Sequence, residues 1–175
     1  MKYFKRQTFL PDNLSLLLVI FTAMLSFPVS GVENVDYARF EKVFESLEME
    51  TIEHKKFKLK ELPSQVVIVN FWASWCIPCL HEMPSLIALS NKFSKKELQV
   101  VAINTDESEQ LKNIIKTKKK LDFPESFIIV PDVKFKIADE FKFSAIPVTV
   151  IFKKGKVLYF NNGPVDFLKV PLDLR

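Results

Sequence analysis

The chain has 175 residues, of which 48% are hydrophobic and 26% charged, a balance that is typical of a globular protein and excludes a wholly disordered one. The formal net charge is +4, and half of this excess falls within residues 1–31. The remainder is too small for the concentrated basic face that nucleic-acid binding requires, so no nucleic-acid partner is expected. Two cysteines, Cys76 and Cys79, are too few for a disulfide framework or an all-cysteine zinc site.

The first 31 residues follow the order of an export signal. Basic residues come first, an uncharged apolar run from Leu14 to Phe27 follows, and Val29-Ser30-Gly31 suits a signal peptidase. At about 1.5 Å per residue the run gives a helix of ~21 Å, shorter than a ~30 Å hydrocarbon core, which favours cleavage. Retention as a membrane anchor through residues 14–28 stays open. In either case we expect the rest of the chain to be periplasmic or otherwise extracytoplasmic, where disulfides persist.

After a lead-in segment at residues 32–44, the chain alternates strands with helices. Apolar positions within 36–47 have helical spacing and indicate a short helix. Predicted strands cover the region around 57–59, then 65–73, 98–104 and 127–130, with a hairpin that pairs 148–152 with 156–160. Predicted helices cover 80–90, 106–120 and 132–141. This alternation favours an α/β fold with a mixed central sheet flanked by helices, in a domain that spans 45–175.

Charged residues set the ends of two of these helices. In the helix predicted at 106–120 the acids, beginning with Asp106, come first and the lysines last, an order that suits the helix macrodipole. We therefore interpret the lysine cluster as a charged helix end rather than a binding patch. Asp132 is the predicted N-cap of the helix over 132–141.

The cysteine pair Cys76-Ile77-Pro78-Cys79 directly follows the most apolar strand and opens a helix. The carboxyl ends of strands are where α/β folds place their chemistry. Unpaired N–H groups and the dipole at the start of a helix stabilise a thiolate over a thiol. We predict that Cys76 is the exposed nucleophile and that Cys79 is the buried thiol that resolves a mixed disulfide, which is the minimum apparatus for thiol–disulfide exchange.

Other interpretations of the pair are weaker. A static structural disulfide would close a very short loop and stabilise the fold only modestly. A zinc or copper site would need both histidines, His54 and His81, so no metal site is predicted. Covalent haem attachment requires a histidine directly after the second cysteine, where this chain has Leu80.

Two segments carry a resemblance to a known family. Residues 71–84 (FWASWCIPCLHEMP) resemble the active-site segment of thioredoxin-fold proteins, and are most similar to that of the exported TlpA/ResA-like thiol–disulfide oxidoreductases. Residues 145–149 (AIPVT) resemble the cis-proline loop of the same proteins, and Lys154-Gly155-Lys156 the hairpin turn that follows it. The resemblance covers roughly residues 45–163. It implies a thioredoxin-like fold with an N-terminal extension, and a redox-active Cys76–Cys79 disulfide without a further cofactor.

The same resemblance implies how substrates bind. A cis Ile146–Pro147 bond would pack against Cys76, and Ile146 would offer its backbone to an extended substrate, because the proline that follows has no N–H. The implied substrate-binding residues are Trp75, Ile77, Pro78, Ile146 and Pro147.

Glu82 is the third candidate catalytic residue. Asn70 stands where cytoplasmic thioredoxins usually carry a buried acid that accepts the proton of the second cysteine, and the TlpA/ResA-like branch often combines this asparagine with a glutamate at the position of Glu82. Three residues after Cys79, its carboxylate would lie on the next turn of the same helix face. There it could tune the thiol pKa values and carry a proton. A solvated surface glutamate is the alternative.

The resemblance implies an extracytoplasmic reductant of protein disulfides, such as the haem-site cysteines of apocytochrome c, that is recharged by a membrane thiol transporter. A DsbA-like oxidant is the alternative, although the uncharged Ile77 and Pro78 favour a reductant. A metallochaperone would need a longer cysteine spacing and a distal histidine, and a redox-silent chaperone module would lack a cysteine. A peroxidase would carry threonine in place of Ala73. The final helix of the family is in doubt, because only residues 163–175 remain for it and they contain two prolines.

Overall fold

The computed structural model describes residues 35–107 and 111–172. The chain divides into two units between Val35 and Asp36, and the fold given below is that of the second. The export signal or anchor expected at residues 1–31 lies outside the described residues. Among those that are described, no helix combines the length and apolar character needed to cross a membrane.

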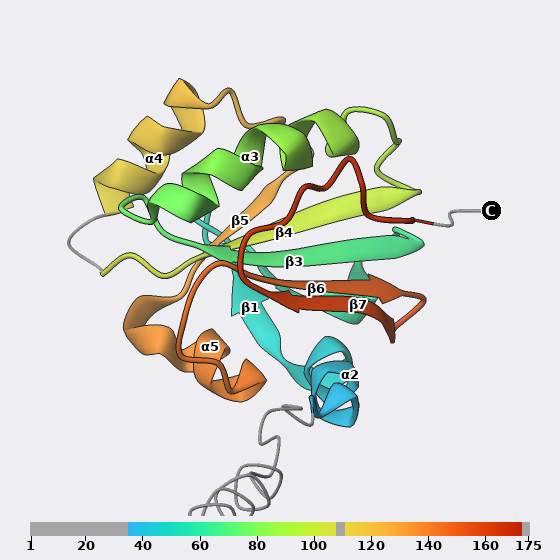
Figure 1. Ribbon diagram of the computed structural model, residues 1–175. Coiled ribbons are helices and arrows are strands. Elements are labelled where there is room, and N and C mark those ends of the chain that lie inside the picture. The colour runs from blue at the N-terminus through green and yellow to red at the C-terminus, as the bar shows by residue number, and fades with distance from the viewer. Residues whose placement is uncertain (1–34, 108–110, 173–175) are drawn as a thin grey trace, which may run out of the picture. The chain divides into compact units, whose positions relative to one another are not determined.

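A five-stranded mixed sheet forms the centre of the fold (Figure 1), with strand order β5-β4-β3-β6-β7. Three neighbouring strands are parallel, namely β3 (Val66–Trp72), β4 (Leu98–Asn104) and β5 (Ile128–Pro131). β6 (Val148–Lys153) runs antiparallel to β3 and forms a hairpin with β7 (Lys156–Asn162) at the edge. β3 and β4 are buried along their whole length, as continuous apolar runs predict for strands covered on both faces. The predicted mixed sheet and its hairpin are confirmed.

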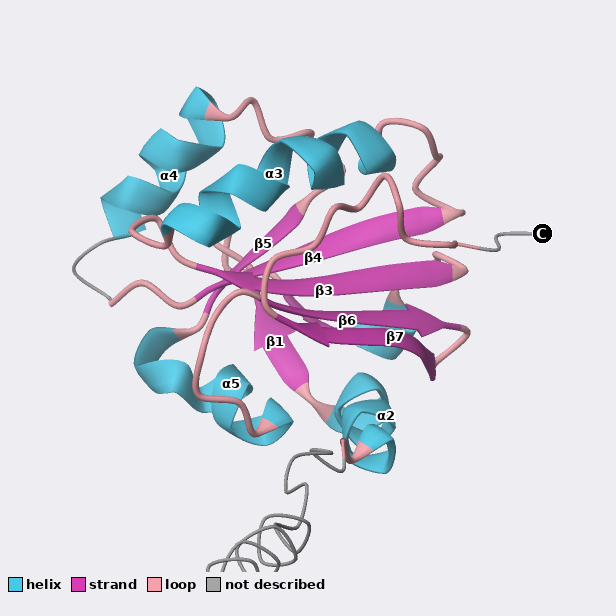
Figure 2. Ribbon diagram, in the orientation of Figure 1, coloured by secondary structure: helices cyan, strands magenta, loops and turns pink. Residues whose placement is uncertain are grey.

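Helices cover both faces of this sheet (Figure 2). α3 (Ile77–Ser90) and α4 (Leu111–Lys120) lie on one face, and α2 (Tyr37–Ser46) and α5 (Lys136–Phe141) lie on the other. The helix predicted within 36–47 is therefore confirmed as α2. Its Phe40 ring packs 5.4 Å from Phe141 of α5 and 5.3 Å from Phe160 of β7, measured between ring centroids, so aromatic contacts join α2 to the rest of the core.

A short antiparallel hairpin precedes the main sheet. β1 (Glu48–Glu50) pairs with β2 (Lys56–Lys58), and a 3-10 turn, η1 (Leu59–Glu61), follows. Leu59 was predicted to continue the strand, but it begins η1 and is fully buried. β1 was not predicted, because a three-residue strand with charged residues at both ends has no recognisable apolar period.

The helix predicted over 132–141 is interrupted. A 3-10 turn, η3 (Val133–Phe135), comes first, and its last two residues, Lys134 and Phe135, have the left-handed φ values of 65° and 56° that end a helix. The buried carboxylate of Asp132 accepts hydrogen bonds of 2.8 Å from the backbone N–H groups of Ile137 and Ala138. The N-cap position of α5 is Phe135, so the predicted N-cap assignment of Asp132 is wrong in position. The Asp132 carboxylate nevertheless accepts from N–H groups in the first turn of α5, because η3 brings it back over that turn. Burial raises its pKa, although these hydrogen bonds act in the opposite direction.

Residues 163–172, called here the C-terminal strap, take the place of a final helix. Among residues described up to 172, none after β7 is helical. The strap leaves the sheet edge and crosses to the face covered by α3 (Figure 1). Val165 and Phe167 are buried in the same cluster as Met83 and Leu86 of α3, whereas Pro164, Asp166 and Leu168 are exposed. Alternating side chains therefore bury an extended segment against the core without a helix.

Candidate active site

Cys76 and Cys79 form a disulfide at the amino end of α3, with the sulfur atoms 2.01 Å apart and the Cα atoms 5.3 Å apart. Cys76 is the N-cap of the helix, and its Sγ accepts a hydrogen bond of 3.3 Å from the backbone N–H of Cys79. Pro78 stands in the first turn, where the missing N–H of a proline leaves no hydrogen bond unmade. A thiolate released at Cys76 would therefore meet the positive end of the helix dipole.

The disulfide is covered, whereas the residues that flank it are not. Cys76 is 4% exposed and Cys79 is fully buried, so the prediction of an exposed Cys76 is wrong for the disulfide form. The reason is local: the sulfur of Cys76 is bonded to Cys79 and turned into the first turn of α3. Trp75 and Ile77 instead take the solvent-facing positions, with exposed fractions of 62% and 66%. Cys76 remains the more accessible cysteine of the two.

The loop before β6 supplies the second part of the site. The peptide bond between Ile146 and Pro147 is cis, as the resemblance implied, with Ile146 half-buried and Pro147 buried. The carbonyl oxygen of Pro147 accepts a hydrogen bond of 2.8 Å from the N–H of Gly163, the first residue of the strap. Beside this loop lies a mainly apolar groove of about 670 Å³. The groove is lined by both Trp75 and Ile146, with Thr105, Phe135 and Phe143 among the other lining residues.

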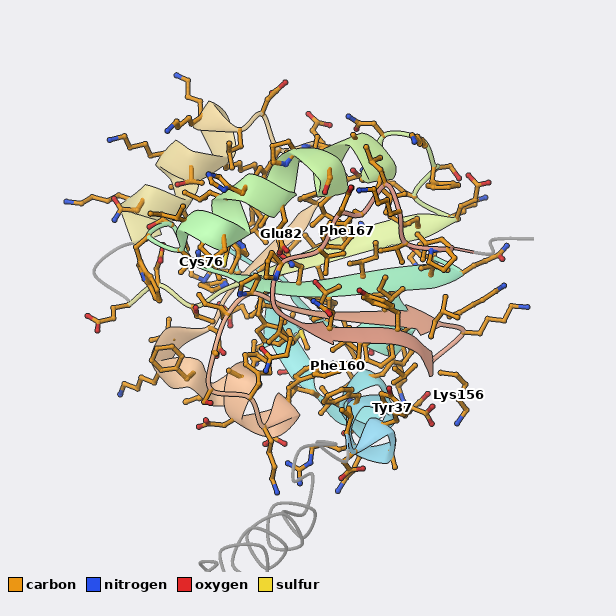
Figure 3. All side chains as sticks on the ribbon, viewed as in Figure 1. Tyr37, Cys76, Glu82, Lys156, Phe160 and Phe167 are labelled. Atoms are coloured by element: carbon orange, nitrogen blue, oxygen red, sulfur yellow. A yellow bond between two sulfur atoms is a disulfide. The ribbon has the colours of Figure 1, made fainter. Side chains whose placement is uncertain are left out.

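Glu82 lies one turn after Cys79 on α3 and is only 4% exposed, so it is not a solvated surface residue. Figure 3 shows it on the side of α3 that faces the sheet, further along the helix than Cys76. Its Oε1 accepts a hydrogen bond of 2.7 Å from the side-chain amide of Asn70, and its Oε2 accepts one of 2.8 Å from the backbone N–H of Val165. Burial raises the pKa of Glu82, while the hydrogen bonds from Asn70 and Val165 partly oppose that rise.

Asn70 connects Glu82 to the two central strands. Its Nδ2 atom on β3 donates to Glu82 and also to Oγ1 of Thr149 on β6, at 3.1 Å. All three side chains are buried. The carboxylate predicted from the helix position is thus held by the sheet beneath it.

Asp106 is a site residue that sequence reasoning assigned to a different role. It was expected in the first turn of a helix, but it is a buried loop residue two positions after β4. Its Oδ1 accepts a hydrogen bond of 2.9 Å from the backbone N–H of Ser74, two residues before Cys76. The N–H of Thr105 likewise donates to the carbonyl of Trp72 at 2.9 Å. These bonds hold the cysteine loop, and the position of Asp106 at the carboxyl end of a central strand was the available signal.

The two histidines lie in different parts of the fold. His54 contacts Glu50 beside the first hairpin at 2.7 Å, and His81 lies on α3. Within the described ranges, no three His, Cys, Asp or Glu side chains are grouped as ligands for a metal ion.

Comparison with known proteins places this site in context. Residues 41–160 match the AhpC/TSA family. A protein from Bacillus cereus (strain ZK / E33L) named thiol-disulfide oxidoreductase ResA is 36% identical over 109 residues, which are 61% of this chain and 60% of the relative. The protein of that name from Bacillus subtilis (strain 168) is 26% identical over 166 residues, covering 91% of this chain and 87% of the relative. The chain therefore matches less than two thirds of the Bacillus cereus relative.

Solved structures show the same fold. StoA from Bacillus subtilis superposes with a TM-score of 0.57 at 24% identity, covering 70% of this chain and 91% of StoA. A thioredoxin-like protein from Aeropyrum pernix superposes with a TM-score of 0.57 at 27% identity, covering 71% of this chain and 88% of that protein. The fold is thioredoxin-like, as the sequence resemblance implied.

Proposed function

This chain belongs to the AhpC/TSA family, and from that premise we propose that it is a protein thiol–disulfide oxidoreductase that acts through Cys76 and Cys79. The observation that carries the proposal is the disulfide at the amino end of α3, in a fold that also has a cis peptide bond before Pro147 and a buried glutamate one turn after Cys79. The names of the curated relatives support the same activity.

The reaction begins from the dithiol form. The Cys76 thiolate attacks one sulfur of a substrate disulfide, so that the substrate S–S bond breaks, a mixed disulfide forms and the departing sulfur takes up a proton. Cys79 then loses its proton and attacks Cys76, which releases the second substrate thiol and leaves the intramolecular disulfide. Two electrons and two protons pass to the substrate, and a separate thiol donor must restore the dithiol.

Glu82 is the group that we assign to the proton of Cys79. It follows Cys79 by one helical turn, and no bulk water surrounds either side chain. Because burial raises its pKa, its carboxylate is a stronger base than that of a solvated glutamate. Its negative charge also disfavours a neighbouring thiolate, which opposes the reduced form and makes the dithiol a better reductant.

The apolar groove is the proposed substrate-binding surface. Trp75 stands next to Cys76 and Ile146 belongs to the cis-proline loop, so a peptide in the groove would lie beside the reacting sulfur. Ile77 and Pro78 are exposed next to the disulfide and would contact the same peptide. Phe135→Ala should raise KM for a disulfide-containing peptide without changing the midpoint potential. Leu158→Ala, on the edge strand β7, is the control and should change neither quantity.

We further propose that the protein is a reductant outside the cytoplasm, with protein disulfides such as those of apocytochrome c as substrates and a membrane thiol transporter as donor. The order of basic, apolar and small residues in 1–31 is that of an export signal, which supports this location. If the signal is not cleaved, residues 14–28 would anchor the protein to the membrane. The uncharged Ile77-Pro78 pair and the carboxylate of Glu82 support the direction of electron flow.

Equilibration of the Cys76/Cys79 pair in defined thiol buffers tests the direction. A midpoint near or below about −250 mV supports a reductant, whereas a value near about −120 mV, on the DsbA side, means an oxidant. Cys76→Ser should abolish reduction of insulin disulfides, and Cys79→Ser should accumulate mixed disulfides with partner proteins. Full activity of the Cys76→Ser protein would refute the proposed chemistry.

A further inference from the structure

The C-terminal strap connects three parts of the site through its own backbone. The N–H of Gly163 donates to the carbonyl of Pro147 in the cis-proline loop at 2.8 Å. The N–H of Val165 donates to the Oε2 of Glu82 at 2.8 Å, and the N–H of Phe167 donates to the Oγ of Ser85 at 3.2 Å. Successive odd-numbered residues thus bond to the loop before β6 and to two positions on α3.

The side chains of the strap hold this backbone in place. Phe167 is fully buried, and with Val165 it belongs to the cluster that includes Met83 and Leu86 of α3. Figure 3 shows Phe167 near Glu82, on the same face of the sheet. At the edge of the strap a small notch of about 260 Å³, open to solvent, reaches Glu82 between His81 and Ser85 of α3 and Asp166 of the strap. The strap therefore covers most of Glu82 on this side, and the notch at its edge is the remaining opening to solvent.

We propose that the strap is a positioning element for the redox centre: Phe167 anchors it, the Val165 N–H fixes the carboxylate of Glu82 one helical turn after Cys79, and the strap limits the access of water to that carboxylate. This inference rests on the proposed function, since it assigns to the strap the control of a group in the proposed exchange reaction. The strap can position Glu82 because its extended backbone lies where a final helix would otherwise pack.

The charged groups around Glu82 are few. His81 from α3 and Asp166 from the strap line the notch, and Asp166 is itself paired with Lys169, whose Nζ lies 3.0 Å from its Oδ2. The sheet contributes the uncharged Asn70 and Thr149, and α3 contributes Cys79. Burial is the largest influence on the pKa of Glu82, ahead of its hydrogen bonds from Asn70 and Val165. Loss of the burial that the strap provides should therefore lower the pKa of Glu82, whereas loss of the Val165 hydrogen bond should raise it.

The experiment titrates the Glu82 side-chain carboxyl by ¹³C NMR in the disulfide form of the full chain. Phe167→Ala should release the strap and admit water, so that the titration midpoint of Glu82 falls towards the value of a solvated glutamate. Phe167→Leu keeps an apolar anchor and should largely restore the wild-type midpoint. Val165→Pro removes one N–H while leaving the cover, so the midpoint should rise further. Leu168→Ala, at an exposed strap position, is the matched control and should titrate like the wild type.

The second measurement is the midpoint potential of Cys76/Cys79 as a function of pH in thiol buffers, which needs no protein substrate. The inflection assigned to Glu82 should move in Phe167→Ala in the same direction as its NMR titration. An unchanged Glu82 titration in Phe167→Ala would overturn the proposal even if Val165→Pro did not fold. A shifted titration with an unmoved potential profile would also overturn it. Wild-type protein that fails to exchange disulfides would instead refute the proposed function, whatever the titrations show.

Discussion

Replacing Glu82 with glutamine should change how the stability of the disulfide form depends on pH. Burial raises the pKa of Glu82 in the folded protein, so the folded chain binds this proton more tightly than the unfolded chain does. The resulting stabilisation is fully present below the unfolded pKa of about 4.3, and it is lost as the pH rises through the folded pKa. Glutamine cannot ionise, and the variant should lack this decline.

The magnitude follows from linkage. A difference of one bound proton between the folded and unfolded states changes the free energy of unfolding by about 1.4 kcal/mol for each pH unit. Between the two pKa values of Glu82 the wild type should therefore lose stability relative to Glu82→Gln, with a slope of at most about 1.4 kcal/mol for each pH unit. Altered hydrogen bonds to Asn70 and Val165 add only an offset that does not vary with pH. The raised pKa of Asp132 affects the wild type and Glu82→Gln equally, so its contribution cancels when their free energies of unfolding are subtracted.

Urea denaturation between pH 4 and pH 8 measures this difference. The free energy of unfolding of Glu82→Gln, minus that of the wild type, should rise with pH and then level off above the folded pKa. Glu140→Gln removes an exposed carboxylate of α5 and serves as the matched control. A flat difference for Glu82→Gln, or a wild type that gains stability relative to the variant as the pH rises, would refute the assignment of a raised pKa to the buried carboxylate.

Three further substitutions test the packing that supports the site. Phe71→Ala deletes a fully buried ring whose centroid lies 5.1 Å from that of Phe141 and 4.3 Å from that of Phe143. Urea denaturation should show that the free energy of unfolding falls by about 3–5 kcal/mol. The control, Leu158→Ala at an exposed position, should lower it by about 0.5 kcal/mol or less. Asp132→Ala leaves two N–H groups of α5 without their acceptor and should destabilise the protein by about 1–2 kcal/mol, measured by thermal denaturation. Gly163→Ala forces a side chain onto a φ of 128° and should lower the urea midpoint, whereas an unchanged midpoint would show that the strap relaxes freely.

The central strands and the cysteine helix could be predicted because each is specified by neighbouring residues. A continuous apolar run such as 66–72 is stable only when it is covered on both faces, and β3 has that burial. The position of Cys76 at the start of α3 follows from the strand before it and the proline after it. The Ile146–Pro147 bond was implied by a five-residue motif, and the structure has it in the cis form.

The errors have different causes, and only that of Asp106 involves segments that meet in the folded chain. Asp106 follows β4 among other acids, so its sequence suggests a helix start, whereas its partner Ser74 lies 32 residues away. Cys76 is covered because it is bonded to Cys79 and lies at the first turn of α3. This low exposure cannot be predicted from the residue type alone. Lys134 and Phe135 have left-handed backbone conformations that interrupt the helix predicted from apolar spacing. Neither residue is a glycine, the residue type that would have indicated a turn.

For the proposed redox centre, sequence determined which residues carry the chemistry, since a thiol pair and a carboxylate one turn apart are properties of a single helix. Tertiary structure alone decided the environment that sets their reactivity. Glu82 is hydrogen-bonded to Asn70, 12 residues before it, and to the backbone of Val165, 83 residues after it. Nearly every residue has a backbone N–H, so the residue type at 165 does not indicate which N–H will bind Glu82. The desolvation of Glu82 depends on which segment packs over it. Both are decided by the path of the strap over the face covered by α3.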